Sequence, residues 1–269
     1  MKRNMKRQGY KGSVMKYVSS ICSDIGIRRK INQDAALVCQ AKTEKDTILF
    51  AVVCDGMGGL EKGELASSTV ISRMSDWFQN VFPSILQHEW NSETLKKSWI
   101  REIAELNKMI YTFGKKRNIR LGTTLTMLLL AEDTYYICNV GDSRIYYLRN
   151  TIQLITRDQS YVQREVDMGR MTKQEALRSN QRNILLQCIG AGVTVMPDFY
   201  KGKYKSDASF VLCSDGFWNA ITEEEIWNML RPDELDQQKD MDEKIEQLVE
   251  TVKHRKEEDN ITVTLIHAV

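Results

Sequence analysis

The strongest local indication of the fold is the segment Ile48-Leu49-Phe50-Ala51-Val52-Val53-Cys54-Asp55-Gly56-Met57-Gly58-Gly59. Its first seven residues are all apolar, which predicts a strand over residues 48–54. The glycine-rich segment that follows predicts a turn. The strand therefore ends at a carboxylate, that of Asp55, at a place where a rigid sheet can present short side chains to one spot. Gly56 lets the backbone approach a ligand closely.

Three further aspartates lie beside predicted strand ends. Asp142 follows a strand predicted over 134–140, Asp215 follows one over 210–213, and Asp259 precedes one over 261–266. If these turns converge, four carboxylates crowd together, which is unfavourable unless a cation neutralises them. Ligands that are all oxygen suit Mg²⁺ or Mn²⁺. The alternative is that Asp-Gly is simply good turn chemistry, and spacing alone leaves both interpretations open.

Arg29 precedes the carboxylate of Asp34 by five residues, just before a strand predicted over 35–39. An arginine beside a metal cluster would bind a phosphate with its planar fork of N–H groups. Taken alone, Arg29 fits an ordinary surface charge better than a phosphate ligand.

The remaining pattern predicts an α+β fold in one domain, because strands occur in groups with pairs of helices between them. The segment 158–183 is polar and helical in composition, and we expect it to lie outside the sheets. Gly114 is expected to end the second helix. Further strands are predicted over 123–130 and 144–149, and helices over 63–81, 91–113, 223–229 and 241–256.

Composition excludes several classes of protein. The 269 residues are 42% hydrophobic and 28% charged, and the longest dominantly apolar stretch, 125–131, is far too short to span a membrane. The six cysteines include no CxxC pair and the three histidines have no metal-ligand spacing. Buried free thiols are typical of a reducing compartment, so we expect a cytoplasmic protein.

The first 20 residues carry six basic and no acidic side chains. We interpret residues 1–20 as a mobile basic segment and residues 21–269 as the folded domain. Contact of this segment with an anionic membrane or a nucleic acid is the alternative. No other feature indicates a nucleic-acid partner.

Seven segments, taken together and in order, resemble the metal-dependent PP2C-type (PPM) Ser/Thr protein phosphatases, in their compact bacterial form. They span about residues 22–268. These segments are Arg29-x-x-Asn32-Gln33-Asp34, Asp55-Gly56-Met57-Gly58-Gly59, Leu121-Gly122-Thr123-Thr124, Val140-Gly141-Asp142-Ser143-Arg144, Leu154-Ile155-Thr156-Arg157-Asp158, Leu212-Cys213-Ser214-Asp215-Gly216-Phe217-Trp218 and Asp259-Asn260-Ile261-Thr262.

The resemblance implies a four-layer αββα sandwich, with two central antiparallel sheets flanked by helix pairs. It also implies two Mn²⁺ or Mg²⁺ ions and a third, weaker metal site. The implied roles are a bridging ligand for Asp55, a carbonyl ligand for Gly56, direct ligands for Asp215 and Asp259, contact through water for Asp34, the third metal for Asp142, and phosphate binding for Arg29.

The implied reaction is hydrolysis of phosphoserine and phosphothreonine by a metal-bridging hydroxide, without a covalent enzyme intermediate. The implied partners are phosphoproteins and a cognate Ser/Thr kinase, and the default expectation is a monomer. The segment 158–183 corresponds to the family's flap beside the active site. Its residues expected to control substrate access are Ser160, Tyr161, Arg164 and Arg178.

Two positions depart from the family pattern. Met57 occupies the place where many eukaryotic members carry a histidine proposed as the general acid, and it cannot donate a proton. Gln33 stands where many members have glutamate, which reduces the negative charge of the site. A non-catalytic binding protein and a phosphatase for small phosphorylated molecules remain alternatives, although none of the expected metal ligands is lost.

Overall fold

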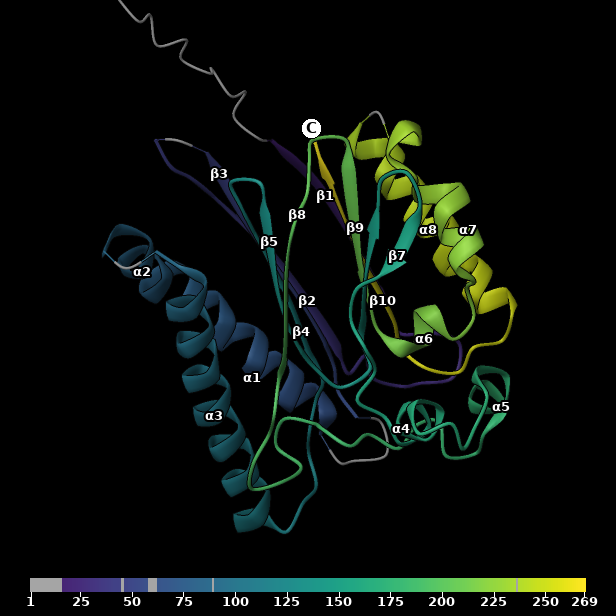
Figure 1. Cartoon of the computed structure of the whole chain (residues 1–269). Coiled ribbons are helices and arrows are strands. Elements are labelled where there is room, and N and C mark those ends of the chain that lie inside the picture. The colour runs from purple at the N-terminus through teal and green to yellow at the C-terminus, as the bar shows by residue number, and fades with distance from the viewer. Residues whose placement is uncertain (1–15, 45, 58–61, 89, 236) are drawn as a thin grey trace, which may run out of the picture.

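The computed structural model describes residues 16–269 apart from 45, 58–61, 89 and 236. Two five-stranded antiparallel sheets stack face to face between two layers of helices, as Figure 1 shows. This four-layer α+β architecture confirms the expected αββα sandwich. Most of the basic residues noted in the N-terminal segment lie outside the described residues.

Strand order places early and late parts of the chain side by side. One sheet has the order β1-β10-β9-β6-β7, and its strands are Tyr17–Asp24, Ile261–Ala268, Ala208–Cys213, Arg144–Leu148 and Ile152–Leu154. The other has the order β2-β3-β4-β5-β8, and its strands are Asp34–Lys42, Thr47–Asp55, Leu125–Ala131, Thr134–Val140 and Asp198–Lys203.

The interior strand β3 is buried on both of its faces. Its alternate residues Leu49, Ala51 and Val53 join the core between the two sheets. Phe50 and Val52 point the other way, into the core beneath the helices. Because successive side chains of a strand point to opposite faces, an all-apolar run is what a strand between two cores requires.

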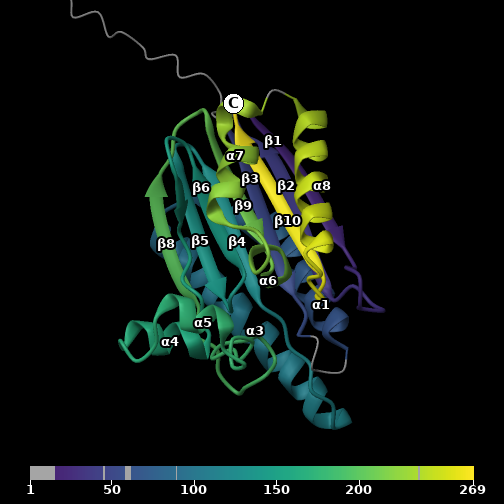
Figure 2. The same ribbon diagram turned by 90° about the vertical axis from the view of Figure 1, so that its right-hand side faces the viewer.

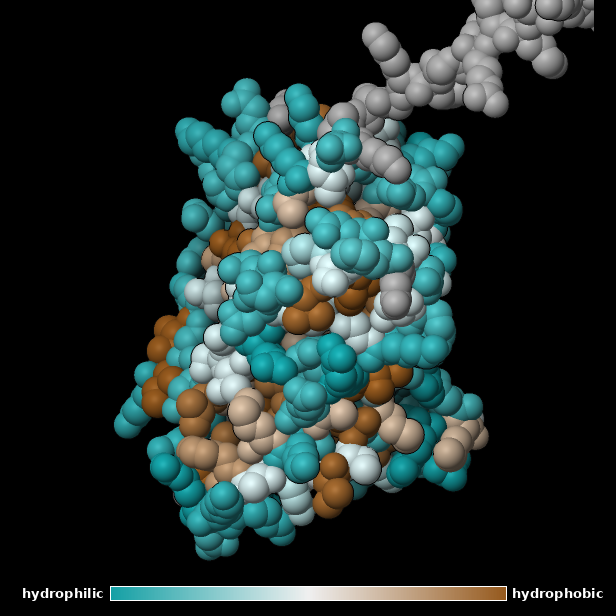
Figure 3. All heavy atoms as spheres, turned by 90° about the vertical axis from the view of Figure 1, so that its left-hand side faces the viewer, coloured by the Kyte–Doolittle hydropathy of each residue, from teal (hydrophilic) through white to brown (hydrophobic). Residues whose placement is uncertain are grey.

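Helices cover the outer face of each sheet. The β2–β8 sheet is covered by α1 (Gly63–Asp76), the π-helical turn η1 (Trp77–Val81), α2 (Phe82–His88) and α3 (Ser92–Arg117). The other sheet is covered by α6 (Asp215–Trp218), α7 (Glu223–Leu230), the 3₁₀ turn η2 (Pro232–Glu234) and α8 (Gln238–His254). The outer face of the first helical layer is predominantly hydrophilic, with hydrophobic residues scattered over it (Figure 3).

The two helices that the sequence predicts for the first layer both extend beyond their predicted ends. The helix expected to end at Val81 continues through η1 into α2, and the rings of Trp77 and Trp99 pack with centroids 5.8 Å apart. Gly114 does not end α3. A Cβ atom at Gly114 would lie 2.8 Å from the carbonyl oxygen of Ile119, so glycine serves close packing there, and the helix ends at Asn118 in a left-handed conformation.

Three strands were not anticipated. β1 pairs with β10 along its whole length, so the domain boundary expected after residue 20 falls within a strand whose Tyr17 and Ser20 are buried. β7 is only three residues long, and β8 is an edge strand in which apolar, charged and glycine residues mix. These segments owe their conformation to pairing with a neighbour more than to a local pattern.

The segment 158–183 leaves the sheets as expected. It forms the short helices α4 (Tyr161–Asp167) and α5 (Lys173–Arg178), which lie together below the sheets in Figure 2. None of the helices in the described ranges combines the length and apolarity needed to cross a bilayer.

The core between the sheets can be tested at Leu128, which is fully buried in β4. Leu128→Ala is expected to lower the free energy of unfolding by about 2–5 kcal/mol, because it leaves a cavity between two sheets that cannot close. Met109→Ala, on the exposed side of α3, is the control and is expected to change it by less than about 0.5 kcal/mol. Denaturant titration measures both; equal effects would contradict this description of the core.

Candidate metal and phosphate site

Asp34 and Asp55 face each other across two paired strands. Asp34 begins β2, Asp55 ends β3, and the two residues are direct partners in the antiparallel ladder. The backbone of Asp55 is fixed further by β4's approach, since its N–H donates to Thr124 Oγ1 (2.9 Å) and its carbonyl accepts from the backbone N–H of Thr124 (2.9 Å). Sheet register therefore sets the separation of the two carboxylates.

A close backbone contact brings Asp215 and Asp259 together. Asp215 is the first residue of α6, directly after β9, and Asp259 lies just before β10. A Cβ atom at Gly216 would lie 2.1 Å from the carbonyl oxygen of Asn260 and 3.3 Å from Cβ of Asp259. Only glycine permits this approach, so the Asp-Gly pair serves packing at the site as well as turn formation.

Asn260 holds the segment that carries Arg29. Its side-chain amide donates to the carbonyls of Ile25 (2.9 Å) and Ile31 (3.1 Å), and its Oδ1 accepts from the backbone N–H of Gln33 (2.9 Å). Ser214 has a similar positioning role, because its hydroxyl donates to Asp34 Oδ2 at 2.7 Å. The sequence patterns contained both residues but assigned neither this role.

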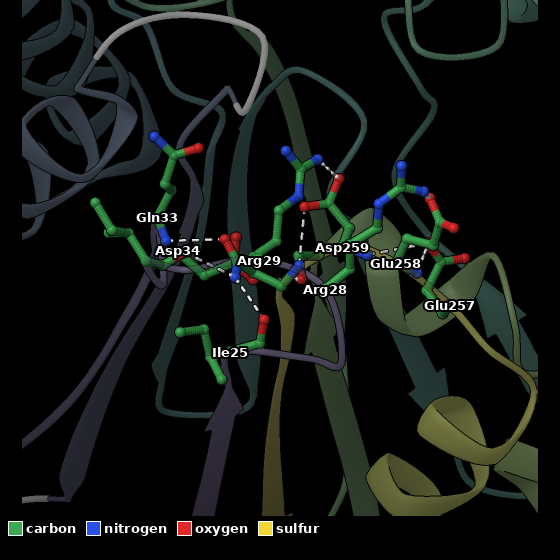
Figure 4. Close-up of polar contacts among 11 residues, drawn as sticks. Ile25, Arg28, Arg29, Gln33, Asp34, Glu257, Glu258 and Asp259 are labelled. Atoms are coloured by element: carbon green, nitrogen blue, oxygen red, sulfur yellow. Dashed lines mark hydrogen bonds and ion pairs between the residues drawn. The ribbon is translucent and has the colours of Figure 1, made fainter.

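Arg29 lies against Asp259, although 230 residues separate them in the chain. Figure 4 shows the guanidinium group directed at the carboxylate, with Nη2 2.7 Å from Oδ2. Burial lowers the pKa of Arg29, but the hydrogen bond to Asp259 and the charges of Asp259, Asp215 and Asp55 outweigh it and raise that pKa. Arg29 therefore stays charged at the edge of the carboxylate group.

Asp142 belongs to the same group of carboxylates but forms no ion pair with any residue in the described ranges. The nearby Arg144 is committed elsewhere: it binds Asp158 through two hydrogen bonds of 3.0 and 2.8 Å and stacks on Trp218 at 3.5 Å. Burial and the charge of Asp215, more than offsetting Arg144, hold the pKa of Asp142 well above its usual range.

The carboxylates repel one another strongly enough to change their protonation. Burial, then the charges of Asp34, Asp215, Asp142 and Asp259, raise the pKa of Asp55 well above its usual value. Burial and the charges of Asp259 and Asp34 raise the pKa of Asp215 to about 7. Burial raises the pKa of Asp34 to about 6, although hydrogen bonds from Ser214 and Thr262 oppose the shift. Negative charge accumulates here without enough cations to balance it.

These residues fit a hard divalent cation. Oδ1 of Asp215 is buried and has no hydrogen-bond partner among the residues that the structure describes, which is costly for an acceptor. The donors available are all oxygens, as Mg²⁺ and Mn²⁺ prefer. Within the described ranges no three His, Cys, Asp or Glu side chains already surround one point, and Asp259 instead directs its carboxylate to Arg29 and to the N–H of Asn260.

Gly56 and Met57 form the turn that follows Asp55. A Cβ atom at Gly56 would lie 2.5 Å from the carbonyl oxygen of Gln33, so this position admits only glycine. Cys188 places its thiol against the Met57 sulfur, and burial raises the pKa of that thiol to about 12. Cys188 therefore remains protonated and is not a nucleophile. Gly58 and Gly59 lie outside the described residues.

The four flap residues expected to control substrate access range from buried to exposed. Ser160 is 2% exposed, caps α4, and lines a cavity of about 250 Å³ with Asp142 and Asp215. Arg164 lies over the Tyr161 ring at 5.1 Å and contacts Glu165. Arg178 is exposed at the end of α5. Arg182, which the sequence analysis did not single out, lines this cavity and also one beside Arg29.

Comparison with known proteins agrees with this geometry. The family described as Protein phosphatase 2C matches residues 27–265. The serine/threonine phosphatase stp of Listeria welshimeri is 31% identical over 91% of this chain and 93% of its own length. The structure of Stp1 from Staphylococcus aureus superposes with a TM-score of 0.81 at 26% identity, over 98% of this chain and 99% of that one.

A second similar structure contains metal. It is the catalytic domain of the protein phosphatase PstP in complex with two manganese ions, with a TM-score of 0.75 and 25% identity over 95% of this chain and 100% of that one. The chain belongs to the protein phosphatase 2C family.

Because the carboxylates of the site repel one another, we predict that the free energy of unfolding depends on pH when a chelator keeps the protein free of metal. The raised pKa values of Asp34 and Asp215 mean that the folded protein keeps protons that the unfolded chain has already released. Unfolding therefore releases protons, and the free energy of unfolding is expected to fall, by on the order of a few kcal/mol, as pH rises from about 4 to 7. Asp215→Asn is expected to flatten this slope and to raise Tm at pH 7.5.

Asp158→Asn provides the matched control for that experiment. Asp158 is also buried, but Arg144 neutralises it. Its replacement leaves Arg144 unpaired and is expected to lower the free energy of unfolding by about 3–5 kcal/mol. Thermal unfolding across pH in EDTA measures both variants. Destabilisation by Asp215→Asn would contradict the repulsion described here.

The Gly216 contact gives an independent prediction. Gly216→Ala is expected to lower the free energy of unfolding by more than about 2 kcal/mol, because its methyl group cannot fit beside the Asn260 carbonyl. Gly192→Ala has no neighbour closer than 3.5 Å and is expected to be nearly neutral. Chemical denaturation compares them, and similar values for both would show that the Gly216 contact is not tight.

Proposed function

We propose that this protein removes phosphate from phosphoserine and phosphothreonine residues of proteins in a reaction that depends on Mn²⁺ or Mg²⁺. The observation that carries the proposal is a group of five carboxylates at one edge of the sandwich with an orphaned oxygen on Asp215 and with Arg29 beside it. The names of similar proteins, and the two manganese ions of the PstP structure, support the same activity.

In this proposal the cation ligands come from strand ends of both sheets. Asp55 and the carbonyl of Gly56 come from one sheet, and Asp215 and Asp259 from the other. Asp34 would act through water, and Asp142 would hold a weaker third ion with Asp215. Cations bound here would activate a water molecule and offset the charge of the phosphate group.

Arg29 would bind and orient the phosphate. A guanidinium group carries five N–H donors, and the hydrogen bond to Asp259 occupies one of them. The remaining N–H groups of the planar guanidinium can donate two parallel hydrogen bonds to the oxygens of a phosphate group. The ion pair fixes the guanidinium group, and Asn260 fixes the backbone after Arg29 by its hydrogen bond to the Ile31 carbonyl. The side chain would therefore lose little conformational entropy when substrate binds.

Among the described residues, the two side chains that meet at the turn, Met57 and Cys188, are poor proton donors. A thioether cannot donate, and the neighbouring Cys188 thiol is held protonated by burial. The leaving serine or threonine oxygen would therefore take its proton from water. This arrangement requires no nucleophilic side chain and no covalent intermediate.

Hydrolysis of a phosphothreonine peptide tests the proposal. Wild-type protein with Mn²⁺ is expected to release phosphate, and EDTA to abolish the release. Asp215→Asn is expected to lower kcat/KM by more than about 100-fold, since even outer-shell changes at metal sites cost 10–100-fold. Asp233→Asn, which makes the same change at an exposed position, is the control and is expected to keep full activity.

Two results would contradict the proposal. One is an absence of hydrolysis by folded protein loaded with Mn²⁺, which would favour a binding protein. The other is turnover of small phosphorylated molecules without turnover of phosphopeptides, which would assign a different substrate class.

A further inference from the structure

A polar cavity of about 650 Å³ opens beside Arg29 and Asp259. Its walls come from the segment before β2, the segment that follows α5, and the turn after α8. It is lined by five cationic and three carboxylate side chains.

The three carboxylates are already engaged. Figure 4 shows Arg28 turned toward Glu258 and Arg29 toward Asp259, and both contacts are ion pairs. Glu257 Oε1 accepts the backbone N–H groups of Glu258 (2.9 Å) and Asp259 (3.3 Å).

Three cations of the cavity form no ion pair with any described residue. The side chains of Lys30, Arg182 and Lys256 make no hydrogen bond or ion pair with another residue in the part of the chain that the structure describes. Like charges that share one cavity raise its electrostatic potential and attract an anion. Five cations and three carboxylates give the cavity a formal charge of +2, which favours the approach of an anion.

The backbone that carries these cations is fixed. Asn260 holds the carbonyl of Ile31, next to Lys30. The N–H of Arg182 donates to the Ser179 carbonyl at 3.2 Å, and that of Lys256 to the Lys253 carbonyl at 3.0 Å. The cations thus extend from anchored positions on three separate segments, so binding an anion costs mainly side-chain ordering.

We infer that this cavity is a second anion-binding site, which takes an acidic side chain or a second phosphate group of the phosphoprotein substrate. The inference rests on the proposed function and adds a substrate preference to it. Arg29 and the three unpaired cations share one cavity. An extended peptide advances about 3.3–3.6 Å per residue, so residues one to three positions from the phosphorylated one can reach these cations.

Kinetics with matched peptides test the inference. Three phosphothreonine peptides carry neutral neighbours, glutamates, or a second phosphothreonine within three positions on either side. Wild-type protein is expected to prefer the two more acidic peptides by about 3- to 10-fold in kcat/KM, mainly through KM, and to lose this preference in high salt. A preference for the second phosphate over glutamate would identify two-point binding by Arg182.

Variants then assign the preference to the cavity. Arg182→Gln and the double variant Lys30→Gln/Lys256→Gln are each expected to reduce it and to leave hydrolysis of p-nitrophenyl phosphate unchanged. Arg120→Gln removes the same charge from a different cavity, which Met57 lines. It is expected to keep the preference, which separates a local site from the overall charge of the protein.

Binding provides a readout that does not depend on turnover. Fluorescence anisotropy of the doubly phosphorylated peptide on Asp215→Asn is expected to show weaker binding when Arg182→Gln is added. No preference in the wild type, a preference that survives both cavity variants, or an equal loss in Arg120→Gln would overturn the inference. Failure to hydrolyse any peptide would instead contradict the proposed function, and the anisotropy experiment would still test the second site.

Discussion

Carboxylates gathered at one edge of the sandwich repel one another, and the fold has to hold them together against this repulsion. Asp34, Asp55, Asp142 and Asp215 all have raised pKa values, because burial and mutual charge disfavour their ionised forms. A protein keeps such an arrangement only if the rest of the fold compensates for it or a ligand neutralises it. The repulsion that lowers the free energy of unfolding would therefore also favour the proposed binding of a metal ion.

Two rigid sheets hold these charges in place. The partner strands β2 and β3 fix Asp34 opposite Asp55, and the contact of Gly216 with Asn260 fixes the other sheet's contribution. The core between the sheets prevents relaxation, since β3 and β4 are buried on both faces. The same rigidity that makes the repulsion costly would preorganise the proposed site for a cation and a phosphate group.

The cations of the site are divided between the carboxylates and the solvent side. Arg144 is committed to Asp158, Arg29 bridges from Asp259 toward the open edge, and Arg182 has no partner among the described residues. This gradient, from paired to unpaired cations, leads from the carboxylate group into the polar cavity. The proposed substrate, a phosphorylated and acidic protein segment, would be complementary to these charges at both ends.

Apolar runs, glycine turns and short motifs are local signals, and from them we could predict the strands of the core, the aspartates at their ends and the family. The sequence did not reveal β1 or β8, whose conformation depends on pairing with β10 and β5, or the packing role of Gly114. Only the tertiary structure brought Arg29 to Asp259 across 230 residues and placed Arg182 and Lys256 in one cavity with Arg29. Such contacts follow from strand order and register, which local periodicity does not encode.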